Sequence, residues 1–204
     1  MTETERELRA TADRLRGADE PPAIAEAAAA AGLLDVAYAT HDSPVGRLVL
    51  AATPAGLARI AYVEDRAGED AVLTGLAARV SPRVLAAPRR LDPARRELDE
   101  YFAGRLQAFG LALDMRLATG FTRRVLAATA AIPYGSVASY LEVATRAGSP
   151  RGSRAAGNAL GSNPLPIVVP CHRVVHSGGG LGGYTGGLER KLKLLAIERG
   201  ASAG

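Results

Sequence analysis

The most constraining feature of this sequence is a set of three strand-like segments early in the chain. Val36–Thr40, Gly46–Thr53 and Gly56–Val63 are rich in residue types that favour strands, such as valine, tyrosine and threonine. Turns that contain proline and glycine separate them, at Ser43–Gly46 and Thr53–Gly56. Turns this short join antiparallel neighbours. We therefore expect an antiparallel meander.

Helices and one more strand complete the first half of the predicted fold. We expect helices over Asp70–Val80 and from Pro93 through Phe102, the second ending at Gly104. A last strand is predicted at Ala108–Met115. Residues 35–116 are thus predicted to form a small α+β domain.

The residues before the meander form a predicted accessory extension, 1–34. Glu5–Arg16 has helical spacing, Gly17–Pro22 interrupts it, and Ala23–Ala31 is a second, alanine-rich helix that ends at Gly32. No residue of this extension suggests chemistry. We expect it to pack against the protein or to tether a partner.

No segment of the sequence suggests a membrane or an export signal. The alanine-rich stretch Ala23–Leu34 is too short to span a bilayer and carries Glu26. The acidic residues of Met1–Glu7 are not followed by the apolar segment of a secretory signal. We expect a cytoplasmic protein with no membrane partner.

The character of the sequence changes after Gly120, from strands to helices with short polar joints. Thr122–Ala131 is a predicted helix, Ser136 can cap a second one through Arg146 or Ala147, and Ser153 can cap a third, Arg154–Leu160. Two helices joined by a short glycine-containing turn form a helix-turn-helix pattern. The same pattern also occurs in helical hairpins of protein cores. Residues 117–204 are therefore predicted to form a helical domain that either reads DNA or packs as such a hairpin.

A stiff segment leads into the only cysteine. Leu165–Val169 is predicted to be a short buried strand or an extended run, because Pro164, Pro166 and Pro170 restrict the backbone. A glycine-rich loop follows at Gly178–Gly187, and then a helix at Leu188–Arg199. The predicted apolar stripe of that helix is Leu188, Leu192, Leu195 and Ala196.

Positive charge is concentrated in the second half of the chain. The whole chain has 25 Lys and Arg against 21 Asp and Glu, a modest excess of +4. Between Arg116 and Arg173, in contrast, Glu142 is the only acid among seven arginines. The arginines are Arg116, Arg123, Arg124, Arg146, Arg151, Arg154 and Arg173. Such a ratio favours a face that contacts phosphates, although solvated surface arginines are the alternative.

Cys171 cannot form an intramolecular disulfide or a multi-cysteine metal site, because it has no second cysteine. A lone cysteine is often a small buried hydrophobic residue. Here, however, His172 is adjacent and a DNA-reading pattern lies just upstream. Neighbouring side chains on an extended backbone point to opposite sides, so we expect a water to bridge the thiol and the imidazole. This arrangement suggests nucleophilic chemistry on a nucleobase.

The segment Pro170-Cys171-His172-Arg173-Val174 resembles the active-site signature of the O6-alkylguanine-DNA alkyltransferases, the methylated-DNA–protein-cysteine methyltransferase family. The resemblance is specific over roughly 115–200 and weaker over 36–115. Its other segments are Asp42–Gly46, Tyr101–Gly104, Ile132–Gly135, Ser139–Tyr140, Ser153–Ala155, Ser162–Pro164, Gly183–Gly187 and Leu194–Glu198. It implies a ribonuclease H-like N-terminal domain and a C-terminal DNA-binding domain with a helix-turn-helix.

The resemblance also implies catalytic roles. Cys171 would take the alkyl group from guanine O6, and also from thymine O4, in a single irreversible turnover. His172 would act as a base through a water, and Glu198 would orient the imidazole. Tyr140 would donate a proton to the leaving guanine. Asn163 would tie the recognition helix to the active-site turn.

Further residues are implied to bind the base and the DNA. Val174 would meet the guanine edge, Tyr184 and Thr185 would form the pocket wall, and Pro166 and Gly186 are the positions expected to influence alkyl size. The base would be flipped out of the duplex, with Arg154 filling the space that it leaves. The implied DNA-contacting residues are Arg151, Arg154, Ala155, Gly157 and Leu160.

The resemblance implies a monomer that binds double-stranded DNA and needs no cofactor. Some relatives hold a structural zinc, but the three histidines here are His41, His172 and His176 and no cysteine is spare, so we expect no metal. We expect His176 to be a solvated loop residue rather than a second base. The chain also lacks the tryptophans that are usual in the family.

Two other classes of protein remain as alternatives. One is a DNA-binding or damage-signalling protein without enzymatic activity, which would use the helix-turn-helix and recruit a partner through residues 1–34. The other is a Cys-His hydrolase that acts on a small molecule. A hydrolase of that class would not need an arginine-rich helix-turn-helix segment.

Overall fold

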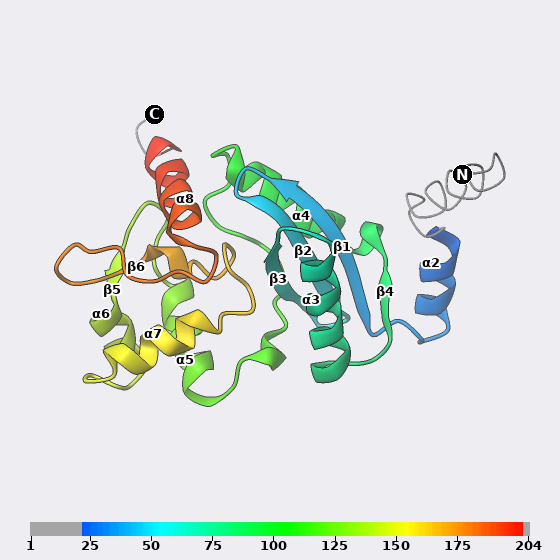
Figure 1. The fold of residues 1–204 in the computed structure, drawn as a ribbon, viewed down its shortest axis with the longest axis horizontal. Helices are drawn as coiled ribbons and strands as arrows, with labels where there is room; N and C mark the ends of the chain where they lie inside the picture. Colours follow the sequence, from blue (N-terminus) through cyan, green and yellow to red (C-terminus); the bar gives the residue numbers. More distant parts are fainter. Residues whose placement is uncertain (1–21, 202–204) are drawn as a thin grey trace, which may run out of the picture.

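The computed structural model describes residues 22–201 of the 204-residue chain. The predicted helix Glu5–Arg16 lies outside this part. A sheet-containing half and a helical half lie side by side, with helix α2 (Pro22–Ala30) at the end remote from the helical half (Figure 1). Ala25 of α2 is buried, and Glu26 pairs with Arg89 at 2.7 Å. This helix therefore packs against the sheet half, as expected for a packing role.

The sheet half contains a four-stranded sheet in the order β3-β2-β1-β4. Its elements are β1 (Val36–Ser43), β2 (Gly46–Thr53), β3 (Gly56–Val63), α3 (Arg66–Arg79), β4 (Val84–Ala86) and α4 (Pro88–Phe102). The first three strands form the predicted antiparallel meander, with β1 longer than expected. The short β4 was not predicted, and it joins the edge of the sheet parallel to β1.

The predicted strand at Ala108–Met115 is wrong. Within this segment only Leu113 forms a bridge, an isolated parallel one to Leu57. The segment crosses the β2–β3 turn so closely that a Cβ on Gly56 would lie 2.3 Å from the Ala112 carbonyl oxygen. Its apolar residues pack against the core from a loop, so their spacing resembled that of a strand.

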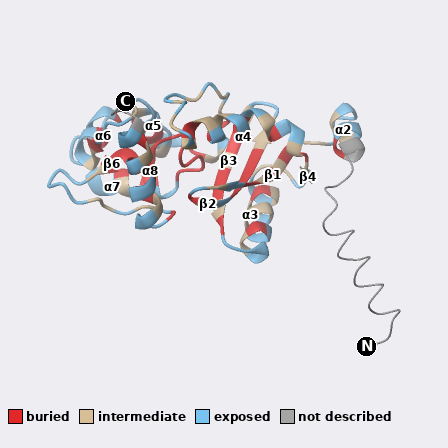
Figure 2. Cartoon of the chain, turned by 90° about the horizontal axis from the view of Figure 1, so that it is seen from above, coloured by how far each residue is buried: buried red, intermediate tan, exposed pale blue. Residues whose placement is uncertain are grey.

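The two helices of this half cover opposite faces of the sheet (Figure 2). Ala37 and Ala39 of β1 join the core cluster that contains α4, whereas Val36 joins the cluster that contains Leu76 of α3. This is the side-chain alternation that a strand imposes. Both helices begin before the predicted residues: Asp65 caps α3, and Pro88 stands in the first turn of α4.

The helical half is built from short helices around the cysteine segment. Its elements are η1 (Met115–Leu117), α5 (Gly120–Ala130), β5 (Ala138–Ser139), α6 (Tyr140–Arg146), α7 (Ser153–Gly161), η2 (Cys171–Arg173), β6 (Val174–Val175) and α8 (Leu188–Ala201). Helices α6 and α7 form the expected helix-turn-helix pair. A single apolar cluster runs through both halves of the protein, from Leu48 of the sheet to Leu194 of α8.

Two predicted helix caps are wrong. Helix α6 is capped by Ser139 rather than Ser136, through a capping box in which Ser139 and Glu142 exchange hydrogen bonds. Helix α7 starts at Ser153, so this residue lies inside the helix, and Gly152 is its N-cap without a side-chain hydrogen bond.

The segment before Cys171 is buried as predicted, but it turns instead of running extended. The Val169 amide donates to the Leu165 carbonyl at 2.8 Å, and Ile167 adopts φ 77°. A β-branched residue is strained at positive φ. Tertiary packing must therefore stabilise the turn against the backbone preference of Ile167.

The predicted apolar stripe of α8 is only partly correct. Leu188 and Leu192 are 49% and 50% exposed, and Ala196 is also exposed. The buried face consists of Lys191, Leu194, Leu195 and Glu198, which are spaced as one face of a helix. Two charged residues therefore face the interior, and their partners form part of the site.

Candidate active site

Cys171 opens the 3₁₀ turn η2 and is 7% exposed. The side-chain nitrogen Nδ2 of Asn163 lies 3.1 Å from its Sγ and also donates to the Val169 carbonyl at 2.9 Å. The Asn163 oxygen accepts from the Leu165 amide at 3.0 Å. Asn163 therefore spans the turn between α7 and Cys171 and fixes the sulfur at the same time.

The thiol of Cys171 is protonated at neutral pH in this environment. Burial raises its pKa to about 11, although the Asn163 amide, the backbone amides at the start of η2 and the charge of Lys191 act in the opposite direction. These donors favour the thiolate once it forms. The site therefore needs a base to remove the proton, and it has groups that hold the resulting anion.

A buried ion cluster lies behind the cysteine. Nε2 of His172 is 2.7 Å from Oε1 of Glu198, and both side chains are buried. Arg173 binds the same carboxylate through one edge of its guanidinium, Nη2 to Oε1 at 2.9 Å and Nε to Oε2 at 3.0 Å. The Gly135 amide donates to Oε2 at 3.2 Å, so both carboxylate oxygens have donors.

These contacts determine the protonation states of the pair. Burial alone would raise the pKa of Glu198, but hydrogen bonds from His172 and Arg173 outweigh it and bring the pKa to about 2. Burial lowers the pKa of His172, against the opposing effect of Glu198. An ionised carboxylate accepts, so Nε2 of the neutral imidazole carries the proton. Nδ1 is buried and has no hydrogen-bond partner among the described residues, so its lone pair is free to accept a proton.

The adjacent residues Cys171 and His172 diverge as predicted, although for a different reason. The backbone turns at η2 rather than running extended, and the imidazole points into the ion cluster. The hydrogen bonds of residues 22–201 include none between the thiol and the imidazole. A relay between the two groups therefore needs an intervening molecule.

Lys191 is a site residue that the sequence predictions missed. Its side chain is fully buried, and Nζ donates to the carbonyls of Val174 at 2.6 Å, Leu181, and Gly183 at 3.5 Å. Burial lowers its pKa and the nearby Cys171 raises it. Lys191 thus fastens the glycine-rich loop to β6, directly after η2, and brings a positive charge near the thiol. Its spacing to Leu194, Leu195 and Glu198 was the signal that could have revealed it.

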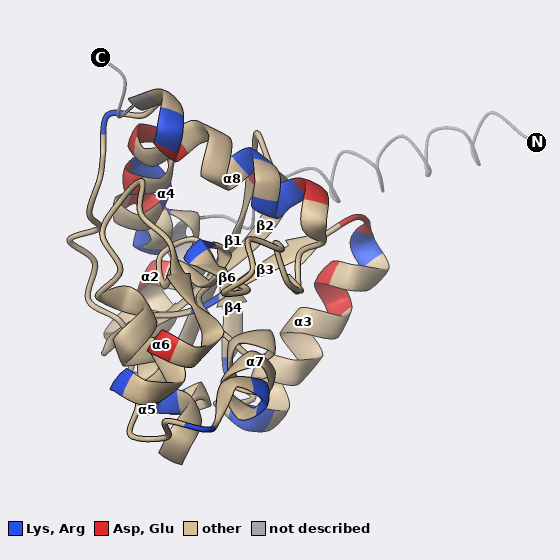
Figure 3. Ribbon diagram, turned by 90° about the vertical axis from the view of Figure 1, so that its left-hand side faces the viewer, with Lys and Arg blue, Asp and Glu red and all other residues tan. Residues whose placement is uncertain are grey.

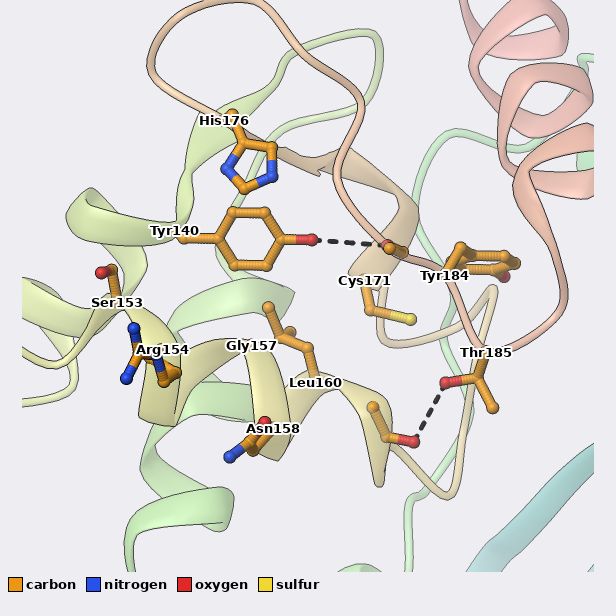
Figure 4. Close-up of a pocket in the computed structure, with 12 residues that line it drawn as sticks. Tyr140, Ser153, Arg154, Gly157, Asn158, Leu160, Cys171, His176, Tyr184 and Thr185 are labelled. Carbon is orange, nitrogen blue, oxygen red and sulfur yellow. Dashed lines mark hydrogen bonds between the residues drawn. The ribbon is translucent and has the colours of Figure 1, made fainter.

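A cavity of about 620 Å³ opens in front of the thiol (Figure 4). Tyr140 points across it and donates to the Gly183 carbonyl at 3.3 Å, and Thr185 donates to the Gly161 carbonyl at 3.0 Å. Its lining residues are Tyr140, Ser153, Arg154, Gly157, Asn158, Leu160, Gly161, Cys171, His176, Gly183, Tyr184 and Thr185. The cavity thus lies between helix α7 and the glycine-rich loop, with the sulfur in its wall.

Seven predicted site residues line this cavity, namely Tyr140, Arg154, Gly157, Leu160, Cys171, Tyr184 and Thr185, and the others do not. Val174 and Pro166 are buried behind the wall, and the Val174 carbonyl faces Lys191. Gly186 packs against Tyr62, where a Cβ would come within 2.6 Å of the ring. His176 was expected to be a solvated loop residue. It is an exposed loop residue, as expected, and it also lines the cavity, with its ring 5.1 Å from that of Tyr140.

The sheet half braces the wall of the cavity from behind. The hydroxyls of Tyr62 on β3 and Tyr184 are 2.7 Å apart. Arg190 lies over the Tyr62 ring at 4.9 Å and donates to the carbonyls of Gly186 at 2.9 Å and Val45 at 2.7 Å. The glycine-rich loop is therefore tied to the sheet as well as to α8.

Basic residues lie around the N-terminal end of helix α7 (Figure 3). Arg151, Arg154 and Ala155 are exposed, Gly157 is half-buried, and Leu160 packs inward. Arg154 lines the cavity and has no ion-pair partner among the described residues. The arrangement suits contact with a polyanion whose reactive part enters the cavity.

Residues 22–201 contain neither a candidate metal site nor a candidate membrane span. No group of three or more His, Cys, Asp or Glu side chains there could hold a metal ion. No helix in the same range is long and apolar enough to cross a membrane.

Comparisons with known proteins agree with this geometry. Two family models match, "6-O-methylguanine DNA methyltransferase, ribonuclease-like domain" over residues 36–115 and "6-O-methylguanine DNA methyltransferase, DNA binding domain" over residues 120–200. A methylated-DNA–protein-cysteine methyltransferase of Mycolicibacterium paratuberculosis is 44% identical over 164 residues, which are 80% of this chain and 93% of the relative. The corresponding constitutive enzyme of Bacillus subtilis is 37% identical over 79% of this chain and 94% of its own length.

Solved structures show the same fold. The O6-methylguanine methyltransferase of Mycobacterium tuberculosis aligns with a TM-score of 0.70 and 39% identity, covering 81% of this chain and 93% of that one. A structure of the same organism's protein in complex with DNA aligns with a TM-score of 0.67 and 38% identity, covering 81% of this chain and 94% of that one. The chain therefore belongs to the 6-O-methylguanine DNA methyltransferase family.

Proposed function

We propose that this protein repairs DNA by moving the alkyl group of O6-alkylguanine onto Cys171. The observation that carries the proposal is the position of the thiol. It lies in the wall of a cavity that Arg154 of helix α7 also lines, with a buried His172–Glu198 pair behind it. The names of the relatives support the same reaction.

The transfer is a displacement at the alkyl carbon. A bond forms between Sγ of Cys171 and the carbon, while the bond from that carbon to guanine O6 breaks. The thiol proton passes through a bridging water to Nδ1 of His172, and Glu198 stabilises the imidazolium. Tyr140 donates its hydroxyl proton to the departing guanine, and the proton held by the His172 imidazolium then returns through solvent to the Tyr140 phenolate. The products are an alkylated cysteine and an unmodified guanine.

The reaction is expected to stop after one turnover. The product is a thioether, whose sulfur is a poor leaving group for water to displace. Regeneration would require a stronger nucleophile than the site provides. The protein would therefore be consumed in proportion to the lesions that it repairs.

The substrate is double-stranded DNA with the damaged base flipped out of the stack. The Cys171 thiol is buried in the cavity wall and cannot reach a guanine that stays stacked in the duplex, so the nucleotide must enter the cavity at a cost of a few kcal/mol. Arg154 stands at the cavity mouth, where it can occupy the gap, and Ala155 and Gly157 let α7 approach the groove. We assign Arg151 a phosphate contact.

The wall residues provide recognition of the base. Tyr184 offers a ring face, held by its hydroxyl contact with Tyr62, and Thr185 offers a hydroxyl, held by the Gly161 carbonyl. Val174, Pro166 and Gly186 act from behind the wall, by fixing its position. A pocket of this kind also accepts O4-alkylthymine, a second substrate in our proposal. We further propose that the protein works as a monomer in the cytoplasm, since one chain supplies every residue of the site.

Mass spectrometry of the full chain tests the proposal. The protein is mixed with a duplex that contains one O6-methylguanine and then digested. A stoichiometric gain of one methylene mass on the peptide that contains Cys171 is the expected result. Cys171→Ala should abolish the gain while retaining affinity for DNA, and an unmethylated duplex should give none.

The other classes of protein predict different outcomes in the same experiment. An unmodified peptide at full DNA binding would identify a DNA-binding protein without transfer activity. A modification that water removes with time would indicate a Cys-His hydrolase. Either result would overturn the proposal.

A further inference from the structure

We infer that Tyr101, which belongs to the sheet half, is a positioning residue for the His172–Glu198 pair. It keeps Nδ1 of His172, the proton acceptor, correctly oriented. This inference rests on the proposed alkyl transfer to Cys171. Tyr101 does not line the cavity, so it acts through the pair and not on the substrate.

The contact joins distant parts of the chain. Tyr101 stands in the last turn of α4, which otherwise covers the sheet. Its hydroxyl donates to Oε1 of Glu198 at 2.8 Å and lies 3.4 Å from Nε2 of His172. Oε1 is the same oxygen that accepts from His172. Tyr101 thus donates to the same carboxylate oxygen that hydrogen-bonds His172 to Glu198.

The surroundings hold Tyr101 in one position. It is fully buried, and its ring packs against Phe102 at 5.4 Å, Phe109 at 5.3 Å and Tyr134 at 6.1 Å between centroids. Burial and the negative charge of Glu198 raise the pKa of Tyr101 far above its ordinary value. The hydroxyl therefore remains a donor at every working pH.

Two physical effects follow from this hydrogen bond. It restricts rotation of the carboxylate, so Oε1 stays aligned with Nε2 and the free nitrogen Nδ1 keeps its direction. It also draws part of the negative charge away from His172, which lowers the basicity of the imidazole. Both effects favour a neutral imidazole that accepts a proton only when the thiol releases one.

Two positively charged groups, Arg173 and Lys191, share the electrostatic task around the pair, whereas Tyr134 is a neighbour that does not touch it. Arg173 of η2 binds both oxygens of Glu198, and Lys191 of α8 lowers the basicity of His172 from a distance. Tyr134 lies beside the cluster, and its hydroxyl donates to the Ile197 carbonyl at 3.5 Å. Among these groups, Tyr101 alone comes from the sheet half.

Tyr101→Phe is the direct test, because it removes the hydroxyl and keeps the ring. Tyr134→Phe is the matched control, since it removes a hydroxyl from the same aromatic cluster without touching His172 or Glu198. The affinity of each full-length variant for methylated duplex is measured, together with the rate of methyl transfer at saturating protein from pH 5 to 9.

The expected result for Tyr101→Phe has three parts. Affinity for DNA stays that of the wild type, because the residue lies away from the DNA face. The saturating transfer rate at neutral pH falls roughly tenfold, less than the loss seen when an orienting carboxylate itself is replaced. The acid limb of the pH profile moves to higher pH, because His172 becomes more basic. Tyr134→Phe keeps the wild-type rate and profile.

A double-mutant cycle with Glu198→Gln separates positioning from general packing. If Tyr101 acts through Glu198, Tyr101→Phe causes no further loss in the Glu198→Gln background. Where Glu198→Gln does not fold, NMR titration of His172 in Tyr101→Phe replaces the cycle, and the His172 pKa should rise.

Three outcomes overturn the inference: a wild-type rate and pH profile for Tyr101→Phe, an equal loss in Tyr134→Phe, or losses that add in the double variant. Failure of the proposed function gives a different result. In that case the wild-type protein itself transfers no methyl group to Cys171.

Discussion

Asn163 and Cys171 are joined by a hydrogen bond of 3.1 Å between Nδ2 and Sγ, at the point where the turn after α7 meets η2. The same amide group ties the Val169 carbonyl and the Leu165 amide. Stability of the turn and reactivity of the thiol therefore depend on one side chain.

Replacing Asn163 by alanine is expected to lower both properties. The variant leaves buried backbone groups without partners, which should reduce the free energy of unfolding by about 2 kcal/mol. The thiolate loses a donor, so the transfer rate should fall as well. Urea denaturation and a transfer assay measure the two effects.

Ser162→Ala is the control for Asn163. Its hydroxyl donates to the Ala159 carbonyl at 2.9 Å and does not touch the thiol. It should keep the wild-type transfer rate. An Asn163→Ala variant with the same rate would show that the amide is only structural.

Lys191→Met should loosen the glycine-rich loop. The substitution keeps the length of the side chain but removes the donor for three carbonyls and the charge near Cys171. We expect slower transfer and faster proteolysis within Gly178–Gly187. Lys193→Met, an exposed position two residues later, should change neither. Equal proteolysis of the two variants would contradict the anchoring role.

The stability of the protein should fall in acid because of Glu198. Its pKa of about 2 in the folded protein lies below the ordinary 4.5, so the folded state binds fewer protons than the unfolded state between these values. The associated stability, about 3 kcal/mol at roughly 1.4 kcal/mol per pKa unit, is present above pH 4.5 and is lost as the pH falls toward 2.

Denaturation of Glu198→Gln between pH 7 and pH 3 checks this effect. The variant should be less stable than the wild type at pH 7, and the difference should shrink as the pH falls. Glu100→Gln removes an exposed partner of Arg105 and should follow the wild type closely. A constant difference between wild type and Glu198→Gln at all pH values would contradict the assignment.

The strands of the sheet and the reactive motif could be predicted because their signals are local. Alternating strand residues and proline-glycine turns identified β2 and β3 with the correct bounds, and Cys171, His172, Asn163 and Glu198 do meet. The predicted strand at Ala108–Met115 failed because an apolar loop that packs on a core has the same composition as a strand.

The residues that support the site could not be found in this way, because their partners are far away in the sequence. Tyr101 contacts a residue 97 positions later, and Tyr62 contacts one 122 positions later. The buried face of α8 was misassigned for the same reason. Lys191 faces inward because backbone carbonyls accept its hydrogen bonds there, and Glu198 because Arg173 binds it. The spacing of apolar residues in the sequence does not reveal such polar partners.

Gly182→Ala should disturb the position of Tyr140. Gly182 has φ 70°, which alanine adopts only with strain, and a Cβ there would lie 2.5 Å from the Tyr140 hydroxyl oxygen. We expect a lower transfer rate, because the proton donor is displaced. Gly178→Ala in the same loop has no heavy atom within 4 Å of its Cβ and should keep the wild-type rate. Equal rates for the two variants would show that the loop accommodates the added methyl group without moving Tyr140.

Arg154 and Arg151 are expected to contribute to DNA repair in different ways. Arg154 lines the cavity, so Arg154→Ala should slow transfer from a duplex far more than transfer from free O6-methylguanine base, which needs no flipping. Arg151 is exposed outside the cavity, so Arg151→Ala should weaken binding uniformly across sequences and reduce the salt slope by about 1. Transfer rates with duplex and free base, together with affinities from 50 to 200 mM salt, distinguish the two roles. If Arg154→Ala slowed both substrates equally, it would act on the chemistry in the cavity instead of on extrusion of the base.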